Sequence, residues 1–478
     1  MGIIQKQAIQ NTFLSYLGAL LGFITVGIIF PNLLSTGENG LIKLLVSLST
    51  LFAQISNLGS GGVITRLFPY FRNKEKKHYG FLFYPVIVSL AGFIICTILF
   101  FSFRDVIIER NIEKSKLFVD YLYYLIPLTF FTLFYLVFDA FTRSILSSVI
   151  GTFLKDFIQR IFILAVVGLY YFSFIDFQQF IALYVASICL PTLLIVIYLV
   201  RKKEWGIIPD YSFLTKTMAY EMVNISLFSI LTSFSYMIIS TIDSIMINDY
   251  MGLEATGIYG ITFYFGAVII IPARSIGRIS SAVLADSWKN NNLEVINTIY
   301  RKSCINQLII GSVIFSGIWV NIDNLLLMLP PEYAAGKYVI FFVGLSNLID
   351  MATGVNGVII STSKYYRYDG FFMLFLVIAV IFSNIIFIPL YGIAGAAMAS
   401  AMALFSFNLL RYIFLYIKFK MQPFNILTII TVLVLLFSFI INTTIPSLAN
   451  PFIDAFIRSI MILTIFSILV GSIWKKIR

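Results

Sequence analysis

Apolar stretches, each about as long as a membrane-spanning helix, follow one another along the whole chain with short polar breaks between them. A helix needs about 20 apolar residues to cross the hydrocarbon core of a bilayer, whereas the strands of a barrel alternate over about ten. The pattern therefore predicts an all-α polytopic membrane protein with about 14 transmembrane helices. They are expected near residues 10–32, 41–64, 79–103, 117–140, 152–173, 178–200, 222–245, 254–278, 303–322, 334–360, 369–390, 392–414, 425–444 and 452–473.

The composition agrees with a membrane protein and argues against several classes of enzyme. Of the 478 residues, 60% are hydrophobic and 12% are charged, and the mean hydropathy is +0.96. Such a chain cannot cover its apolar surface with polar groups in water. Cys96, Cys189 and Cys304 stand alone in apolar segments, where we expect them to fill the core. The only histidine, His78, lies in a charged loop and is expected to be solvated. Histidine-based catalysis and histidine metal clusters are thus nearly excluded, and no cofactor or metal is expected.

The distribution of lysine and arginine predicts the orientation in the membrane. Basic residues gather in the loops at 66–78, 201–216, 278–302 and 364–370 and in the tail 475–478. Because basic loops stay on the cytoplasmic side, both termini are expected in the cytoplasm. The net charge of +11 then reflects inner loops beside anionic lipids, and no nucleic acid partner is expected.

Two short segments indicate an internal repeat. LSTGENGLI (34–42) precedes the second predicted span, and YMGLEATGIYG (250–260) precedes the eighth; each is a small acidic glycine turn that leads into a membrane helix. The match pairs spans 2 and 8, as two pseudo-symmetric six-helix bundles require. We therefore expect an N-terminal lobe at 1–205, a C-terminal lobe at 206–420 and two additional helices at 421–478.

Polar residues in the segment KLLVSLSTLFAQISNLGSGG (43–62) recur at intervals of four and three. This spacing places them on one face of a helix, and spans 1 and 7 carry similar stripes. The stripes are Lys43, Ser47, Thr50, Gln54, Asn57 and Gly61; Asn11, Ser15, Gly18, Gly22 and Thr25; and Ser226, Ser229, Ser233, Tyr236, Ser240 and Asp243.

Two explanations of the stripes stay open. Small residues and hydroxyls let helices pack closely, which suits Gly18, Gly22 and most of the serines. Amides and charges need water or a polar partner in the membrane, so Lys43, Gln54 and Asn57 favour a water-filled cavity lined by spans 1, 2, 7 and 8. Asp243 favours the same cavity.

Several charged residues lie near the ends of spans or inside them. Arg274 and Arg278 are one turn apart near the cytoplasmic end of span 8, and Arg66 is at the corresponding end of span 2. These arginines either snorkel to the interface or form a cationic entrance suited to a phosphate group. Asp350, in span 10, is expected either to neutralise a buried arginine or to act as an ion-coupling site.

Two further pairs of opposite charge are spaced four residues apart. Asp156 and Arg160 in span 5 are expected to form an ion pair, and Asp139 and Arg143 at the end of span 4 allow the same interpretation.

Three motifs resemble those of polysaccharide flippases in the multidrug/oligosaccharidyl-lipid/polysaccharide exporter superfamily. IPLYGIAGAAMASAMALF (388–405) is similar to the signature that links spans 11 and 12 in that family. STIDSIMINDYMGLEATGIYGITFYFGAVI (240–269) resembles its passage from span 7 to span 8, and FDAFTRSILSSVIGTFLKDFIQRIFIL (138–164) its span 4 to span 5 region. Unlike related lipid II flippases and drug exporters, the first span here has no arginine or aspartate, so their specific sites do not carry over.

The resemblance implies two six-helix bundles around a central cavity and alternating access. The implied function is movement of an undecaprenyl-pyrophosphate-linked oligosaccharide to the outer leaflet of a bacterial plasma membrane, for an O-antigen-type surface polysaccharide. Partners would be membrane lipids and the polymerase and glycosyltransferases of the same pathway. A drug/cation antiporter is the alternative, and a membrane polymerase or glycosyltransferase is a third class that usually needs a larger outer loop. The candidate substrate-binding residues are Lys43, Gln54, Asn57, Arg66, Asp243, Arg274 and Arg278.

Overall fold

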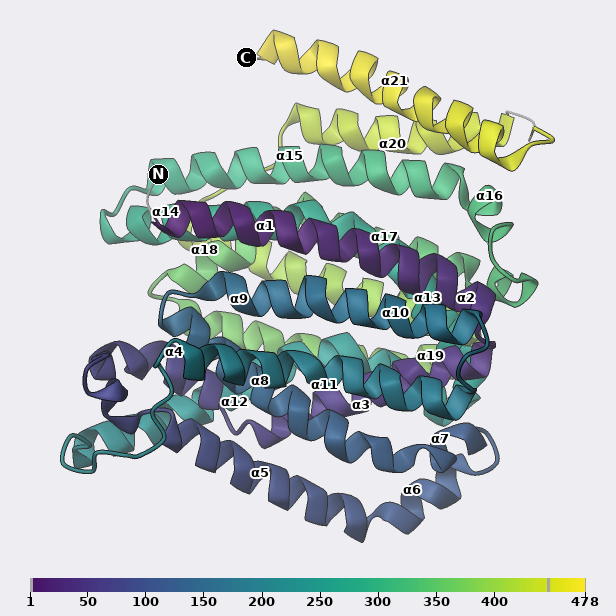
Figure 1. The fold of residues 1–478 in the computed structure, drawn as a ribbon. Coiled ribbons are helices and arrows are strands. Elements are labelled where there is room, and N and C mark those ends of the chain that lie inside the picture. Colours follow the sequence, from purple (N-terminus) through teal and green to yellow (C-terminus); the bar gives the residue numbers. More distant parts are fainter. Residues whose placement is uncertain (1–2, 445–447, 478) are drawn as a thin grey trace. The chain divides into compact units, whose positions relative to one another are not determined.

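The computed structural model describes residues 3–444 and 448–477 of the chain, and every regular element in these ranges is a helix (Figure 1). The all-α fold class is therefore confirmed. The chain forms two compact units, one of residues 1–29 and 37–256 and the other of residues 30–36 and 257–478. The first unit extends past residue 206 and includes span 7. The lobe boundary expected near residue 206 concerns the internal repeat, and it stays a prediction.

The first unit consists of long helices with short π and 3-10 segments between some of them. Its elements are α1 (Ile3–Gly22), η1 (Phe23–Ile29), α3 (Thr36–Ser56), α4 (Ser60–Phe71), η2 (Lys77–Gly80), α5 (Phe83–Ser102), α6 (Arg104–Asn111), α7 (Lys116–Asp120), η3 (Leu122–Tyr124), α8 (Leu125–Ser144), α9 (Ser148–Thr152), η4 (Phe153–Ile158), α10 (Gln159–Tyr171), α11 (Phe177–Arg201) and α12 (Lys216–Met251).

The second unit continues in the same manner, and its last two helices pack on α15. Its elements are α2 (Phe30–Leu33), α13 (Leu253–Ala267), η5 (Val268–Ile270), α14 (Ile271–Lys289), α15 (Leu293–Val320), α16 (Ile322–Leu326), η6 (Pro331–Gly336), α17 (Lys337–Ala352), α18 (Asn356–Thr362), α19 (Tyr366–Phe419), α20 (Ile426–Thr444) and α21 (Pro451–Ile477). Phe315 of α15, Leu435 of α20 and Ile462 of α21 share one buried apolar core, which fixes the additional helices to this unit.

Ten helices in the described part of the chain are long and apolar enough to cross a membrane. One of them, α19, is 54 residues long and covers two predicted crossings; its backbone bends at Gly392, where φ is 59°. Each of the other predicted crossings also falls on a helix. The protein is thus a multi-pass membrane protein, and the number of fourteen crossings stays a prediction.

The second predicted crossing, 41–64, differs from the expectation of one continuous helix. Helix α3 ends at Ser56, and the chain turns through Leu58 and Gly59, both with positive φ, before α4 begins. A Cβ atom at Gly59 would lie 2.3 Å from the backbone oxygen of Ser226 on α12, so glycine permits both the turn and the close approach. The expected continuation of the polar stripe to Gly61 is therefore wrong, because Gly61 belongs to a separate helix.

The loop after α4 is bound to the segment that follows α11. His78, expected to be solvated, is instead 3% exposed, and its Nε2 lies 2.6 Å from a carboxylate oxygen of Glu204. Because the backbone N–H of Asn73 donates to Nδ1 at 3.2 Å, the ring proton resides on Nε2 and is donated to Glu204. Lys74 pairs with the other oxygen of the same carboxylate at 2.9 Å.

A ring stack and a backbone hydrogen bond extend this connection, which we call the loop clasp (residues 73–80 with 204–213). The ring of Tyr79 stacks on that of Phe213 with centroids 3.9 Å apart, and the N–H of Asp210 donates to the carbonyl of Tyr79. Partial burial alone would raise the pKa of the Glu204 carboxyl, but hydrogen bonds from Lys74 and His78 outweigh it and hold that pKa below its ordinary value. The stabilisation from this carboxylate is thus present above its ordinary pKa and is lost as the pH falls through the lower folded value.

We predict that Glu204→Gln loosens the loop clasp by about 1–3 kcal/mol, because a buried imidazole donor and an ammonium lose their carboxylate partner. Limited proteolysis of the purified protein should cut residues 204–213 several-fold faster in this variant at pH 7. Glu75→Gln, which neutralises an exposed acid in the same loop, is the matched control and should leave the cleavage rate unchanged. Equal cleavage of Glu204→Gln and wild type would show that the carboxylate does not hold the clasp.

Candidate functional site

Two of the predicted stripes meet within the first unit. Lys43 on α3 and Asp243 on α12 interact electrostatically although they are 200 positions apart in the sequence, and Asp243 is 6% exposed. Opposite charges inside membrane spans stabilise each other because water is too scarce to solvate them. Further along the same face of α3, Gln54 is half-buried, and Asn57, just after the end of this helix, is 5% exposed. Among the residues that the structure describes, none forms a hydrogen bond with the Oδ1 atom of Asn57, so a polar ligand or water could bind there.

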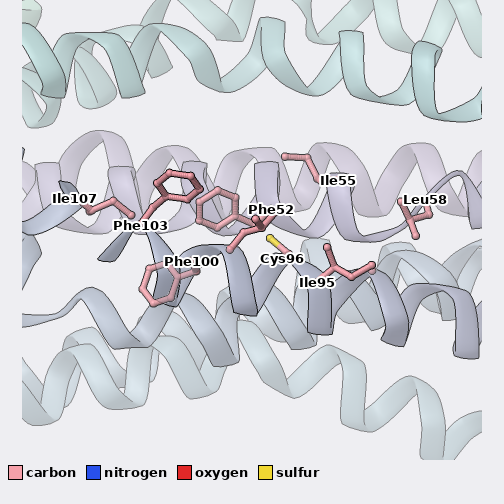
Figure 2. A pocket seen from close by; sticks show the side chains of 10 residues that line it. Phe52, Ile55, Leu58, Ile95, Cys96, Phe100, Phe103 and Ile107 are labelled. Carbon is pink, nitrogen blue, oxygen red and sulfur yellow. The ribbon is translucent and has the colours of Figure 1, made fainter. Parts of the chain in front are cut away.

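The opposite side of α3 is apolar. Phe52 and Ile55 line a pocket of about 250 Å³ together with residues of α5 and the start of α6, including Cys96 and Phe100 (Figure 2). The described side chains that form it are hydrocarbon or sulfur, so it offers contact to apolar chains only. Helix α3 therefore separates a polar face from an apolar one, as the spacing of its residues predicts.

The stripe on span 1 serves helix packing. A Cβ atom at Gly18 would lie 2.4 Å from the backbone oxygen of Asp156 in η4, so α1 approaches the π segment closely. The hydroxyl of Ser15 donates to the Asp156 carboxylate at 3.3 Å. Within the first unit, this part of the stripe fits the packing explanation. The side chains of Ser233, Tyr236 and Ser240 in the span 7 stripe lie outside the described residues.

The two predicted pairs four residues apart have different outcomes. Arg143 pairs with Asp139 at 3.1 Å, which confirms that interpretation. Among the residues that the structure describes, no ion pair joins Asp156 to Arg160. The reason is the π-helical segment η4, whose wider turn removes the i, i+4 alignment of an α-helix: Asp156 turns toward α1, and Arg160 lines a different surface.

A polar network surrounds Asp350 in the second unit. The Nδ2 group of Asn408, on α19, donates to the carboxylate of Asp350 at 3.1 Å. The Oδ1 atom of the same amide accepts hydrogen bonds from Thr353 and Asn356, each at 3.0 Å. Because Asn408 is 1% exposed and uses both ends of its amide, it connects α17, α18 and α19 through the core of the unit.

An arginine lies next to this network, as one of the two expectations for Asp350 requires, but its direct partner is another acid. Arg411 donates from Nη2 and Nε to one oxygen of Asp369 at 2.6 and 3.1 Å and lies over the ring of Phe407. It is 7% exposed, and it also attracts Asp350 electrostatically. Sequence reasoning missed the pair because Asp369 and Arg411 stand near the ends of two predicted spans, where charges normally face water.

The predicted arginine entrance is only partly described. Arg66, on α4, and Arg274, on α14, are exposed. The side chain of Arg278 lies outside the described residues. Exposure suits both snorkelling and a cationic entrance, so the role of the three arginines stays a prediction. The described residues contain no group of three or more histidine, cysteine or acidic side chains placed to hold a metal ion.

Solved structures with this fold are membrane transporters. The lipid II flippase MurJ in an inward closed conformation is 13% identical, with a TM-score of 0.76 over 98% of this chain and 99% of that one. An inward-facing multidrug resistance MATE family transporter of the MOP superfamily is 13% identical, with a TM-score of 0.65 over 86% and 98%. A MOP superfamily transporter from Pyrococcus furiosus is 13% identical, with a TM-score of 0.57 over 87% and 96%. The chain thus shares its fold with these transporters.

The sequence identifies the family. The family model described as polysaccharide biosynthesis protein matches residues 4–284, more than half of the chain. The chain belongs to this family, which confirms the resemblance expected from the three motifs. Comparison with curated protein sequences gives no match.

We predict that Asp369→Asn and Asp350→Asn differ in their effect on stability. Asp369→Asn leaves the buried Arg411 guanidinium without its direct carboxylate partner and should destabilise the protein by about 3–5 kcal/mol. Asp350→Asn keeps a hydrogen-bond acceptor for Asn408 and should lower the free energy of unfolding by only about 1 kcal/mol. The midpoint of thermal unfolding of the two purified variants measures this difference. A larger loss for Asp350→Asn would make Asp350 the principal counter-charge of Arg411.

We also predict that Lys43 and Asp243 depend on each other. Lys43→Leu or Asp243→Leu should each lower the amount of folded protein in the membrane. Each variant removes one charge and leaves the opposite charge inside the spans without this counter-charge. The double variant should recover most of the folded protein, since it removes both charges. If the losses of the two single variants simply add in the double variant, the pair is not coupled.

Proposed function

We propose that the protein is a flippase that moves undecaprenyl-pyrophosphate-linked oligosaccharide repeat units from the cytoplasmic to the outer leaflet by alternating access. The observation that carries this proposal is membership of the polysaccharide biosynthesis family on a fold shared, over nearly the whole chain, with a lipid II flippase. The product would be a surface polysaccharide of the O-antigen type. The protein would act in the bacterial inner membrane, with both termini in the cytoplasm.

The chemistry of such a substrate suits the described residues. A pyrophosphate-linked lipid has an anionic centre, a glycan rich in hydroxyls and a long apolar chain. Basic side chains and amides inside the spans can receive the first two. We assign this role to Lys43, Gln54, Asn57, Arg66, Arg274 and Arg278. We assign Asp243, which interacts with Lys43, to the same binding site, and ion coupling to Asp350.

The alternative is a drug/cation antiporter, which needs acidic groups that are available to a cation. In the second unit the half-buried acid Asp369 pairs with Arg411, and in the first unit Asp243 interacts electrostatically with Lys43. This pairing favours the flippase, because the acids in these positions are already compensated. Glycosyltransferases of the same pathway would supply the lipid-linked glycan, and a polymerase would consume it.

The proposal predicts that the purified protein in proteoliposomes moves a fluorescent undecaprenyl-pyrophosphate-linked oligosaccharide between leaflets. The exposed fraction of the glycan, measured by an enzyme that cannot cross the bilayer, should change at least tenfold faster than in protein-free vesicles. A cationic dye such as ethidium should not accumulate under the same ion gradient. Transport of the dye without movement of the glycan would assign the protein to the antiporter class.

A further inference from the structure

The apolar pocket beside α3 is a groove that α3 and α5 leave open on the surface of the first unit. The two helices approach closely where a Cβ atom at Gly92 would lie 2.2 Å from the backbone oxygen of Ser56. Beyond this contact the groove runs between them, with Leu58 near one end and Ile107 at the other (Figure 2). Several side chains that line it are exposed, so the groove is open to the hydrocarbon around the unit. They are Ile55, Ile95, Leu99 and Phe103.

The length of the groove matches one leaflet of a bilayer. Helix α5 lines it from Gly92 to the end of the helix at Ser102. At 1.5 Å per residue, this stretch is about 15 Å long. The hydrocarbon core of a bilayer is about 30 Å thick, so each leaflet contributes about the same 15 Å. The groove therefore extends through the hydrocarbon depth of one leaflet.

The size and the lining of the groove suit part of one lipid chain. A volume of about 250 Å³ holds about eight groups of about 30 Å³, the size of a water molecule or a methylene group. The lining side chains are hydrocarbon except for the thiol of Cys96. A peptide or a glycan would leave its hydrogen-bonding groups without partners here, which is costly in an apolar environment. A hydrocarbon chain has no such cost.

A cation lies beside the end of the groove where α5 ends. Arg104 follows the lining residue Phe103 and precedes Ile107 by three positions on α6, so Arg104 and Ile107 share one face of this helix. The guanidinium carbon of Arg104 lies 5.6 Å from the centroid of the Tyr123 ring, and its Nη1 atom lies 3.6 Å from the carboxylate of Asp105. Asp105 is 87% exposed, and such surface pairs contribute little. The partly exposed guanidinium can therefore also bind a phosphate oxygen.

We propose that this groove binds one acyl chain of a membrane glycerophospholipid and that Arg104 binds the phosphate of the same lipid. An acyl chain spans one leaflet and begins near a phosphate at the interface, which is the arrangement of the groove and the arginine. An undecaprenyl chain is several times longer than the groove. The bound chain fills space that side chains leave open between α3 and α5, so it stabilises the position of α3. The inference does not depend on the proposed function, because any bilayer supplies this ligand.

Photo-cross-linking tests the site. The probe is phosphatidylglycerol with a diazirine in its acyl chain, added to the purified, delipidated full-length protein in dodecyl maltoside micelles. We expect saturable labelling, with adducts on Phe52 and Ile95 at least fivefold more frequent than on Ile94 and Ile98. The latter two are exposed on α5 but do not line the groove. Equal labelling of both sets would show only the general lipid layer around the helix and would overturn the proposal.

Variants that fill the groove give a second test. Leu99→Trp should reduce labelling of Ile95 at least fivefold, whereas Ile98→Trp is the matched control and should leave it unchanged. Leu99 and Ile98 are 51% and 59% exposed, so both variants should unfold within a few degrees of wild type. Phe103→Trp fills the other part of the groove and provides the same test if Leu99→Trp does not fold. Unchanged labelling in a folded variant of either kind would overturn the site.

The phosphate contact has its own measurement. Arg104→Gln should raise the probe concentration at half-saturation at least fivefold, whereas Arg110→Gln, an exposed arginine on the same helix, should not change it. Equal concentrations for wild type and Arg104→Gln would remove the arginine from the site and overturn the proposal as stated.

Stability and competition identify the ligand. Phosphatidylglycerol that binds only the folded state should raise the midpoint of thermal unfolding of delipidated wild type by several degrees, and it should do so less in Leu99→Trp. Undecaprenyl phosphate that displaces the probe at lower concentration than phosphatidylglycerol would assign the groove to the carrier lipid and overturn the proposal. Failure of the protein to move a lipid-linked glycan in proteoliposomes would change none of these results, so the two proposals fail separately.

Discussion

The cost of placing charges and amides in hydrocarbon organises both units. A polar side chain in a membrane span must find a partner within the protein, a water-filled space or a ligand. Partners within the protein satisfy the polar network of Asp350, Asn408, Thr353 and Asn356. The same holds for Arg411, which pairs with Asp369. Lys155 and Arg160 instead line a cavity. The packing of the helices then follows from where these residues must meet.

The breaks in the helices have the same origin. Backbone groups freed by a turn inside a membrane must be satisfied within the protein, so such turns are placed where another helix approaches closely. The turn at Gly59 lies against the backbone of α12, and the π segment η4 lies against Gly18 of α1. Each break changes the direction in which the side chains that follow it point. The π segment separates Asp156 from Arg160 and allows the arginine to reach the cavity.

Much of the fold could be predicted from hydropathy and spacing, because crossing length and apolar content are local properties. The all-helical class, the separation of α3 into polar and apolar faces and the ion pair of Asp139 with Arg143 follow from patterns within one segment. What sequence reasoning missed depends on irregular backbone or on contacts between distant segments. His78 lies in a charged loop, and only the approach of Glu204 from beyond α11 buries it. Arg411 and Asp369 are separated by 42 positions, and no local spacing relates them.

Acids lie beside the cations of both units, and this arrangement limits how a substrate could act on them. In the second unit, the guanidinium of Arg411 is held by a carboxylate and an aromatic ring, so its charge is compensated in the absence of substrate. In the first unit, Lys155 contacts the ring of Tyr135 and is attracted by Asp139 and Asp156. A ligand shifts a conformational equilibrium only through a difference in its binding to the two states. An anionic substrate would therefore have to compete with these acids more successfully in one state than in the other.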